Sequence, residues 1–201
     1  MKPLLVALGC AIALGLTPLP PMGAAEATDP MPLKLGSARV TIAGHSNIDE
    51  FTASTLEAQV VELRLKPGAA DVFAPGVIET FDIVVRAASL ATFHPGFDRD
   101  LHAALKTAAF PDVTFRLSWI ESAATNDTYR AVGLLQIAGV EKEVALDLRA
   151  TPSTSAILVN GTTTLKMTDF GITPPSLFIG LVQVSPTITV SFETVFVKPT
   201  T

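Results

Sequence analysis

Hydrophobic and polar residues alternate along most of this chain. Residues 77–86 place Val77, Glu79, Phe81, Ile83 and Val85 on one face, and polar side chains such as Asp82 on the other. Alternation with a period of two is typical of β-strands that bury one face. The same pattern predicts strands over residues 39–43, 55–66, 113–119, 129–138, 143–149, 157–167 and 187–193. The chain is therefore predicted to form eight strands.

Two segments depart from this alternation. The period slips at Val60-Val61, which predicts a β-bulge or a strong bend within residues 55–66. Between residues 97 and 108 the apolar positions instead recur at helical spacing, as Phe97, Leu101 and Ala104 show. We therefore expect one short amphipathic helix over residues 97–108, ended by Phe110-Pro111.

Antiparallel strands without a βαβ rhythm predict an all-β sandwich or closed barrel. Long strands and a bulge favour closure, because a closed sheet has no free edges and bulges supply curvature. The interior of an eight-stranded barrel holds either packed side chains or one small ligand. The pattern alone leaves open whether this interior is filled or hollow.

The first 25 residues have the three-part layout of a secretory signal peptide. Lys2 gives a positive start, residues 4–16 are apolar, and Gly23-Ala24-Ala25 forms a small-residue cleavage site. The apolar run is shorter than the roughly 20 residues of a membrane-spanning helix. Cys10 follows Leu-Gly as in a lipobox but lies too early in the chain. We expect a signal peptide over residues 1–25, a flexible leader over 26–35 and one domain over 36–201.

Composition and charge exclude several classes of protein. Hydrophobic residues make up 48% of the chain, which excludes intrinsic disorder. The formal net charge is −5, whereas binding to nucleic acid normally requires a basic face. Cys10 is the only cysteine, so a mature domain would lack thiol catalysis and cysteine-ligated metals. No nucleic-acid partner is expected.

The residues that could carry catalysis or bind a metal form no convincing site. His94, Asp98 and His102 have i,i+4 spacing, but Pro95 argues against a helix that already includes His94. Asp98 and Asp100 are better explained as favourable charges at a helix start. There is no Gly-x-Ser-x-Gly nucleophile elbow, and Asp169-Phe170-Gly171 stands without the other kinase motifs. We predict no catalytic residue, no metal and no cofactor.

Five segments resemble the YceI family in consistent order over residues 35–197. They are Gly44-His45-Ser46-Asn47-Ile48, residues 97–106 (FDRDLHAALK), residues 110–115 (FPDVTF), residues 133–142 (GLLQIAGVEK) and residues 168–176 (TDFGITPPS). The resemblance implies an eight-stranded, lipocalin-like antiparallel barrel with one short helix, exported to the bacterial periplasm. It also implies an apolar tunnel for a polyisoprenoid tail, such as a quinone or prenyl chain, or for a fatty-acid-derived amphiphile.

The alternation predicts which side chains would line such a tunnel. The strand residues chosen are Phe81, Ile83, Phe115, Leu117, Val144, Leu146, Val159, Leu165, Ile188 and Val190. Residues that could close one end are Leu101, Leu105, Phe110, Phe170 and Phe178. The threonines Thr162, Thr164, Thr187 and Thr189 should face water.

Three hypotheses about function follow. The first is an exported, non-catalytic binding or transport protein for a polyisoprenoid or similar lipid, without a stable membrane span. The sequence leaves open whether this protein is a monomer or a homodimer. The second is a periplasmic stress or interaction protein with a packed interior, which an exposed apolar patch would favour. The third, a hydrolase, requires polar groups that converge with His94 or His102.

Overall fold

The computed structural model describes residues 33–69, 71–125, 127–177 and 181–198. The strands are β1 (Lys34–Ser46), β2 (Glu50–Thr55), β3 (Ala58–Leu65), β4 (Ile78–Arg86), β5 (Asp112–Ser122), β6 (Thr128–Ile137), β7 (Val140–Pro152), β8 (Ala156–Lys166), β9 (Ser176–Leu177) and β10 (Val182–Val197). The helical elements are the α-helix α1 (Pro95–Ala104) and two 3₁₀ turns, η1 (Ala87–Ser89) and η2 (Met167–Phe170).

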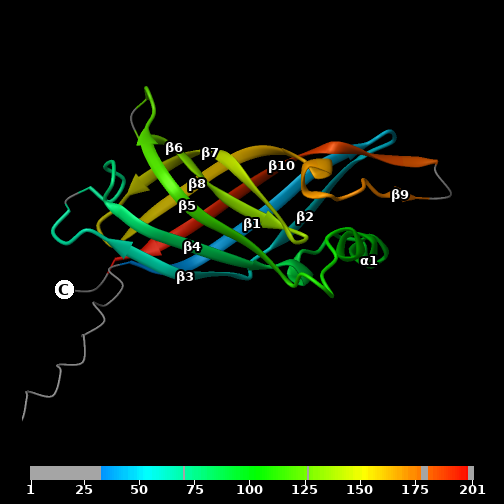
Figure 1. The fold of residues 1–201 in the computed structure, drawn as a ribbon, viewed down its shortest axis with the longest axis horizontal. Helices are drawn as coiled ribbons and strands as arrows, with labels where there is room; N and C mark the ends of the chain where they lie inside the picture. The colour runs from blue at the N-terminus through cyan, green and yellow to red at the C-terminus, as the bar shows by residue number, and fades with distance from the viewer. Residues whose placement is uncertain (1–32, 70, 126, 178–180, 199–201) are drawn as a thin grey trace, which may run out of the picture. The chain divides into compact units, whose positions relative to one another are not determined.

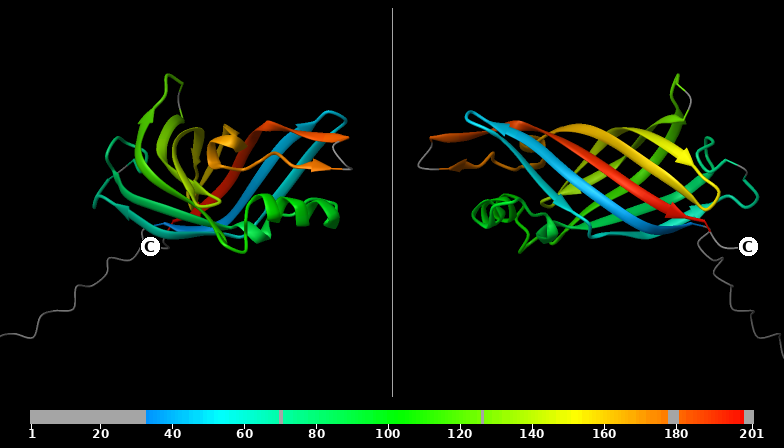
Figure 2. Two further views of the ribbon diagram at one scale, coloured as in Figure 1. Left: turned by 45° about the vertical axis from the view of Figure 1, so that its right-hand side comes forward. Right: turned by 180° about the vertical axis from the view of Figure 1, so that it is seen from behind.

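Nine of the strands form one antiparallel sheet, in the order β2-β1-β10-β8-β7-β6-β5-β4-β3, while β9 pairs only with β10. The sheet curls strongly into a half-barrel, so that β3 at one edge contacts β1 near the other (Figure 1; Figure 2, left). Within the described ranges, no strand pairing joins β3 to β1 or β2. The all-β prediction is confirmed, but the eight-stranded closed barrel is corrected to this nine-stranded curled sheet.

The additional strand is β2, which lies before the predicted strand 55–66 and shares only Thr55 with it. Residues 50–55 pair with β1, then Leu56 and Glu57 intervene, and β3 pairs with β4. Thr55 marks this corner: its Oγ1 accepts a hydrogen bond from the Glu57 amide at 2.9 Å. One continuous stretch of chain therefore supplies both edge strands of the curled sheet.

Bulges decide which side chains face inward. The register of β3 against β4 shifts between Val60 and Glu62, which confirms the predicted bulge and leaves Val61 63% exposed. A second shift lies in β5 between Leu117 and Trp119. Alternation from Val113, Phe115 and Leu117 predicts Trp119 on the inward face. The bulge instead turns Ile120 inward and Trp119 outward, where it is 46% exposed.

The helix is shorter than predicted and begins earlier. Pro95 occupies its first turn, where a missing backbone N–H costs nothing. The helix ends at Ala104, and Lys106 then adopts a left-handed conformation with φ of 53°, which stops further helical turns. Residues 105–108, predicted as helix, therefore form the turn that leads into β5.

The described part of the chain begins inside the expected leader. Leu33 is buried and Lys34 opens β1, so the end of the predicted segment 26–35 belongs to the sheet. The predicted signal peptide and residues 26–32 lie outside the described residues. The part of the chain that is described contains no helix long and apolar enough to cross a membrane.

Candidate functional site

The concave side of the curled sheet encloses a cavity of about 570 Å³. Ligand pockets in proteins commonly have volumes of about 300–1,000 Å³ and mostly apolar walls. Residues on alternate positions of the strands form the wall, as Ile188, Val190 and Phe192 do along β10. The interior is therefore hollow rather than completely filled with side chains.

Glycines on the concave side leave room for phenylalanine rings to lie against the wall. Gly161 of β8 pairs directly with Phe192, and Gly44 of β1 pairs with Phe51 of β2. A Cβ atom at Gly161 or Gly44 would lie 2.6 or 2.4 Å from the facing ring. The close approach explains why the wall has aromatic side chains and still encloses free volume.

The cavity opens to solvent at one end of the sheet, since the exposed residues of its wall all belong to residues 46–52 and 92–97. Figure 1 shows that the β1–β2 turn and α1 lie at this end. Three apolar residues on its wall are exposed there: Ile48 by 70%, Phe93 by 93% and Phe97 by 38%. The rings of His94 and Phe97 meet edge to face with centroids 5.5 Å apart. We call this end, formed by residues 46–52, 92–94 and α1, the mouth.

The opposite end is covered by the β3–β4 loop. Val72 and Phe73 of this loop line the cavity and pack against a buried cluster that includes Leu33, Leu63 and Phe196. The Phe73 ring lies 4.9 Å from the ring of Tyr129. Burial and the nearby Asp71 and Asp127 raise the pKa of Tyr129 above its ordinary value.

Polar residues on the cavity wall are confined almost entirely to the mouth. Two threonines lie deeper, and both hydroxyls donate to backbone carbonyls: Thr163 to Ala145 at 2.9 Å and Thr194 to Val159 at 3.1 Å. The remaining polar wall residues are Ser46, Asp49, Glu50, Thr52, Thr92, His94 and Asp100. The cavity is thus amphipathic along its length, with an apolar interior and a polar entrance.

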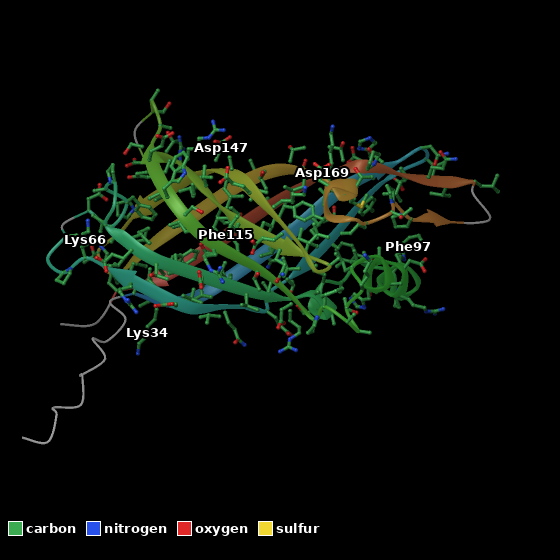
Figure 3. All side chains as sticks on the ribbon, viewed as in Figure 1. Lys34, Lys66, Phe97, Phe115, Asp147 and Asp169 are labelled. Carbon is green, nitrogen blue, oxygen red and sulfur yellow. The ribbon has the colours of Figure 1, made fainter. Side chains whose placement is uncertain are left out.

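All but three of the predicted tunnel residues line this cavity. Phe81, Ile83, Leu101, Leu105, Phe115, Leu117, Leu146, Val159, Leu165, Phe170, Ile188 and Val190 belong to its wall, and Figure 3 shows Phe115 within the curl of the sheet. Val144 packs against buried residues next to the cavity without lining it. Phe110 is 40% exposed and lies against Gly139. Phe178 lies outside the described residues.

The predicted outward threonines fit the same register. Thr162, Thr164 and Thr189 are exposed, whereas Thr187 is half-buried. Glu79, predicted on the inward face of its strand, is exposed, and Ile78 lines the cavity instead. The register between β3 and β4 shifts between Arg64 and Leu65, opposite Ile78 and Glu79. These two residues therefore do not follow the regular alternation that begins at Phe81.

Several wall residues were not predicted from the sequence. Val40 and Ile42 belong to a strand whose inward face was not assigned, and Ala53 belongs to the unpredicted β2. Phe51, Ala53 and Thr55 do alternate with more polar residues, as in a strand. Alanine and threonine are too weakly hydrophobic, however, for this alternation to predict β2 from the sequence. Phe73 and Phe93 lie on loops, where periodicity carries no information.

The histidines and acids considered as a metal site have other roles. Asp98 Oδ1 accepts hydrogen bonds from the backbone N–H of Thr92 at 2.6 Å and from its hydroxyl at 2.8 Å. These two bonds lower the pKa of the Asp98 carboxyl. His102 Nε2 lies 2.8 Å from the carbonyl oxygen of Leu90. In the described ranges, no three His, Cys, Asp or Glu side chains group as metal ligands would.

Solved structures from three bacteria, among others, share this fold. BcnA of Burkholderia cenocepacia is 14% identical with a TM-score of 0.65, and the match covers 79% of this chain and 95% of that one. The YceI protein of Campylobacter jejuni is 22% identical with a TM-score of 0.56, over 72% and 82% of the two chains. A polyisoprenoid-binding domain from Saccharophagus degradans, implicated in plant cell wall breakdown, is 12% identical with a TM-score of 0.61, over 84% and 99%.

Sequence comparison extends this likeness from fold to family. A search of curated proteins finds no match to this chain. The family model of the YceI-like domain, however, matches residues 38–196, which include β2 to β9, most of β1 and all but the last residue of β10. The chain therefore belongs to the YceI-like domain family.

Proposed function

We propose that this protein is a non-catalytic binding and transport protein whose cavity holds the tail of a polyisoprenoid, such as a quinone or prenyl lipid, or of a similar long-chain amphiphile. The observation that carries the proposal is the cavity of about 570 Å³, with apolar walls and polar wall residues gathered at one open end. An amphiphile has the same division, with a long apolar tail and a polar head group.

The energetics of burial support a ligand held by its tail. Each buried methylene contributes about 0.8 kcal/mol, so a five-carbon isoprene unit contributes about 4 kcal/mol. Three buried units would nominally reach the roughly 12 kcal/mol of nanomolar affinity, before the costs of association. Tight binding therefore requires no catalytic or covalent chemistry from the wall.

The fold comparison supports the same class of ligand. The Saccharophagus degradans domain that shares this fold is described as polyisoprenoid-binding. The wall of the present cavity offers the apolar surface that such a tail needs, from Phe81 and Phe115 in the sheet to Leu101 in α1.

The alternative is an interaction or stress protein with a packed interior. The cavity disfavours it, because close packing leaves few voids larger than a water molecule. Exposed apolar residues would favour it, but Ile48 and Phe93 lie on the cavity wall at the mouth. We therefore assign these residues to ligand entry.

We further propose that the protein is exported to the periplasm after removal of residues 1–25. The layout of Lys2, the apolar run and the small residues before Glu26 supports this proposal. Intact-mass measurement of the protein from a periplasmic extract should give a chain that begins at Glu26. A chain that retains Met1 and stays in the cytoplasm would contradict export.

Binding can be tested with a series of prenyl alcohols of graded length. Delipidated mature protein should bind them with an affinity that rises over the first units and then stops rising once the cavity is filled. Displacement of a fluorescent apolar probe reports each affinity. No displacement by any member, or an affinity independent of length, would contradict the proposal.

A further inference from the structure

The charged side chains on the cavity wall all carry the same sign. Asp49, Glu50 and Asp100 line it, and no Lys or Arg does so in the part of the chain that the structure describes. Protein sites for carboxylates and phosphates typically supply Arg or Lys as a partner. The mouth therefore lacks the cations that an anionic head group would need.

Asp100 has the most suitable position for contact with a head group. It follows Phe97 by one helical turn and precedes Leu101, and all three residues line the cavity. Its side chain belongs to a half-buried residue, and within the described residues it has no hydrogen-bond or ion-pair partner. A carboxylate accepts hydrogen bonds and attracts cations.

The other polar groups nearby do not reverse this charge. The cations Arg99 and Lys106 are exposed and absent from the wall, and Lys106 Nζ donates to the Gly171 carbonyl at 3.3 Å. At the start of α1, Pro95 has no backbone N–H, and the amides of Phe97 and Asp98 donate to the His94 carbonyl. Of the first four residues of the helix, only Gly96 could therefore offer its amide to an anion at the mouth.

We propose that Asp100 selects the head group of the bound amphiphile: the cavity takes tails that end in a hydrogen-bond donor without negative charge, an alcohol, amide or amine. Carboxylates and phosphates of equal tail length are disfavoured. A carboxylate by itself would identify no ligand, but this one lies at the open end of a large apolar cavity. The inference rests on the proposed function and narrows its ligands to prenols, quinols or amides instead of oxidised quinones, fatty acids or prenyl phosphates.

Four ligands that share the same tail and differ in the head group test this selection: farnesol, farnesylamine, farnesoic acid and farnesyl phosphate. Each displaces a fluorescent apolar probe from the delipidated mature protein. We expect the alcohol and the amine to bind at least about tenfold more tightly than the two anions, because the Asp100 carboxylate repels a negatively charged head group. Equal affinity for all four would overturn the inference and leave the proposed function standing. No binding by any of them would overturn both.

Two matched variants separate a local from a general effect of charge. Asp100→Asn keeps the shape of the side chain and removes its charge, so the anions should gain and the amine should lose several-fold. Asp147→Asn makes the same change on the exposed outer face of β7, away from the cavity wall, and should leave the affinities unchanged (Figure 3). Equal shifts in the two variants, with both folded by circular dichroism, would overturn the role of Asp100.

Discussion

Single residues determine how much of the interior stays empty. Gly44 pairs with Phe51, whose ring occupies the space that a Cβ atom would need. A larger residue at position 44 must displace this ring, and the ring lines the cavity. The free volume near the mouth thus depends on the absence of a Cβ atom at position 44.

Replacement of Gly44 by alanine should therefore weaken ligand binding and cost about 1–3 kcal/mol of stability through overpacking. The measurement is probe affinity together with urea unfolding. Gly96→Ala provides the control, because a Cβ atom at Gly96 has no neighbour within 4 Å and the residue lies in α1. It should leave affinity unchanged and stability equal or slightly higher. Equal effects of the two substitutions would contradict this account.

Asp98 couples stability to pH. Its folded pKa lies below the ordinary value of 3.8, chiefly because the Thr92 amide and hydroxyl donate to the carboxylate. The carboxylate therefore stabilises the fold above pH 4, and this contribution is lost as the pH falls through the folded pKa. Asp98→Asn should lower the urea midpoint at pH 7, and this effect should become smaller as the pH falls below 3.8. An equal decrease of the urea midpoint at pH 7 and at pH 2 would show that the charge of Asp98 does not cause the stabilisation.

At the scale of elements, regular alternation in the sequence predicts the sheet well. The inward faces of β8 and β10 were predicted correctly from Val159, Leu165 and Ile188 because no bulge interrupts these stretches. Prediction fails where backbone irregularity changes the period: the bulge after Leu117 could not be inferred, so Trp119 was placed on the wrong face.

Prediction of the candidate site from the sequence is limited in a similar way. Side chains that strands place on its wall are predictable from their period, but those contributed by loops are not. Phe73 reaches the cavity from the β3–β4 loop and Phe93 from the segment before α1. Tertiary packing alone positions these two rings, one at each end of the cavity. The sequence therefore predicted the middle of the cavity better than its ends.

The β3–β4 loop should determine the longest tail that the cavity accepts, because Phe73 covers the end opposite the mouth. Phe73→Ala should extend the length at which affinity for prenyl alcohols stops rising by about one isoprene unit, since the lost ring opens space of that order. Phe93→Ala removes the same ring at the mouth and should leave this limit unchanged. A limit that stays the same in Phe73→Ala would show that another element closes the cavity.

At the scale of the whole molecule, ligand binding and stability are linked. A ligand that binds only the folded state at 100 times its Kd adds about 2.7 kcal/mol to the free energy of unfolding. For a domain of this size that corresponds to a rise in Tm of about 5–10 °C. Delipidation should lower the Tm by this amount and added farnesol should restore it. An identical Tm before and after extraction would contradict a resident ligand.

The most direct test of the central claim is mass spectrometry of an organic extract of the mature protein, purified without detergent from an exporting bacterial host. We expect one long-chain amphiphile at near-stoichiometric amount, with an isoprenoid tail and an uncharged or cationic head group. An extract that contains no lipid, from a protein that also takes up no added prenol or quinone, would contradict the binding function. The search for function would then move to the outer surface of the sheet.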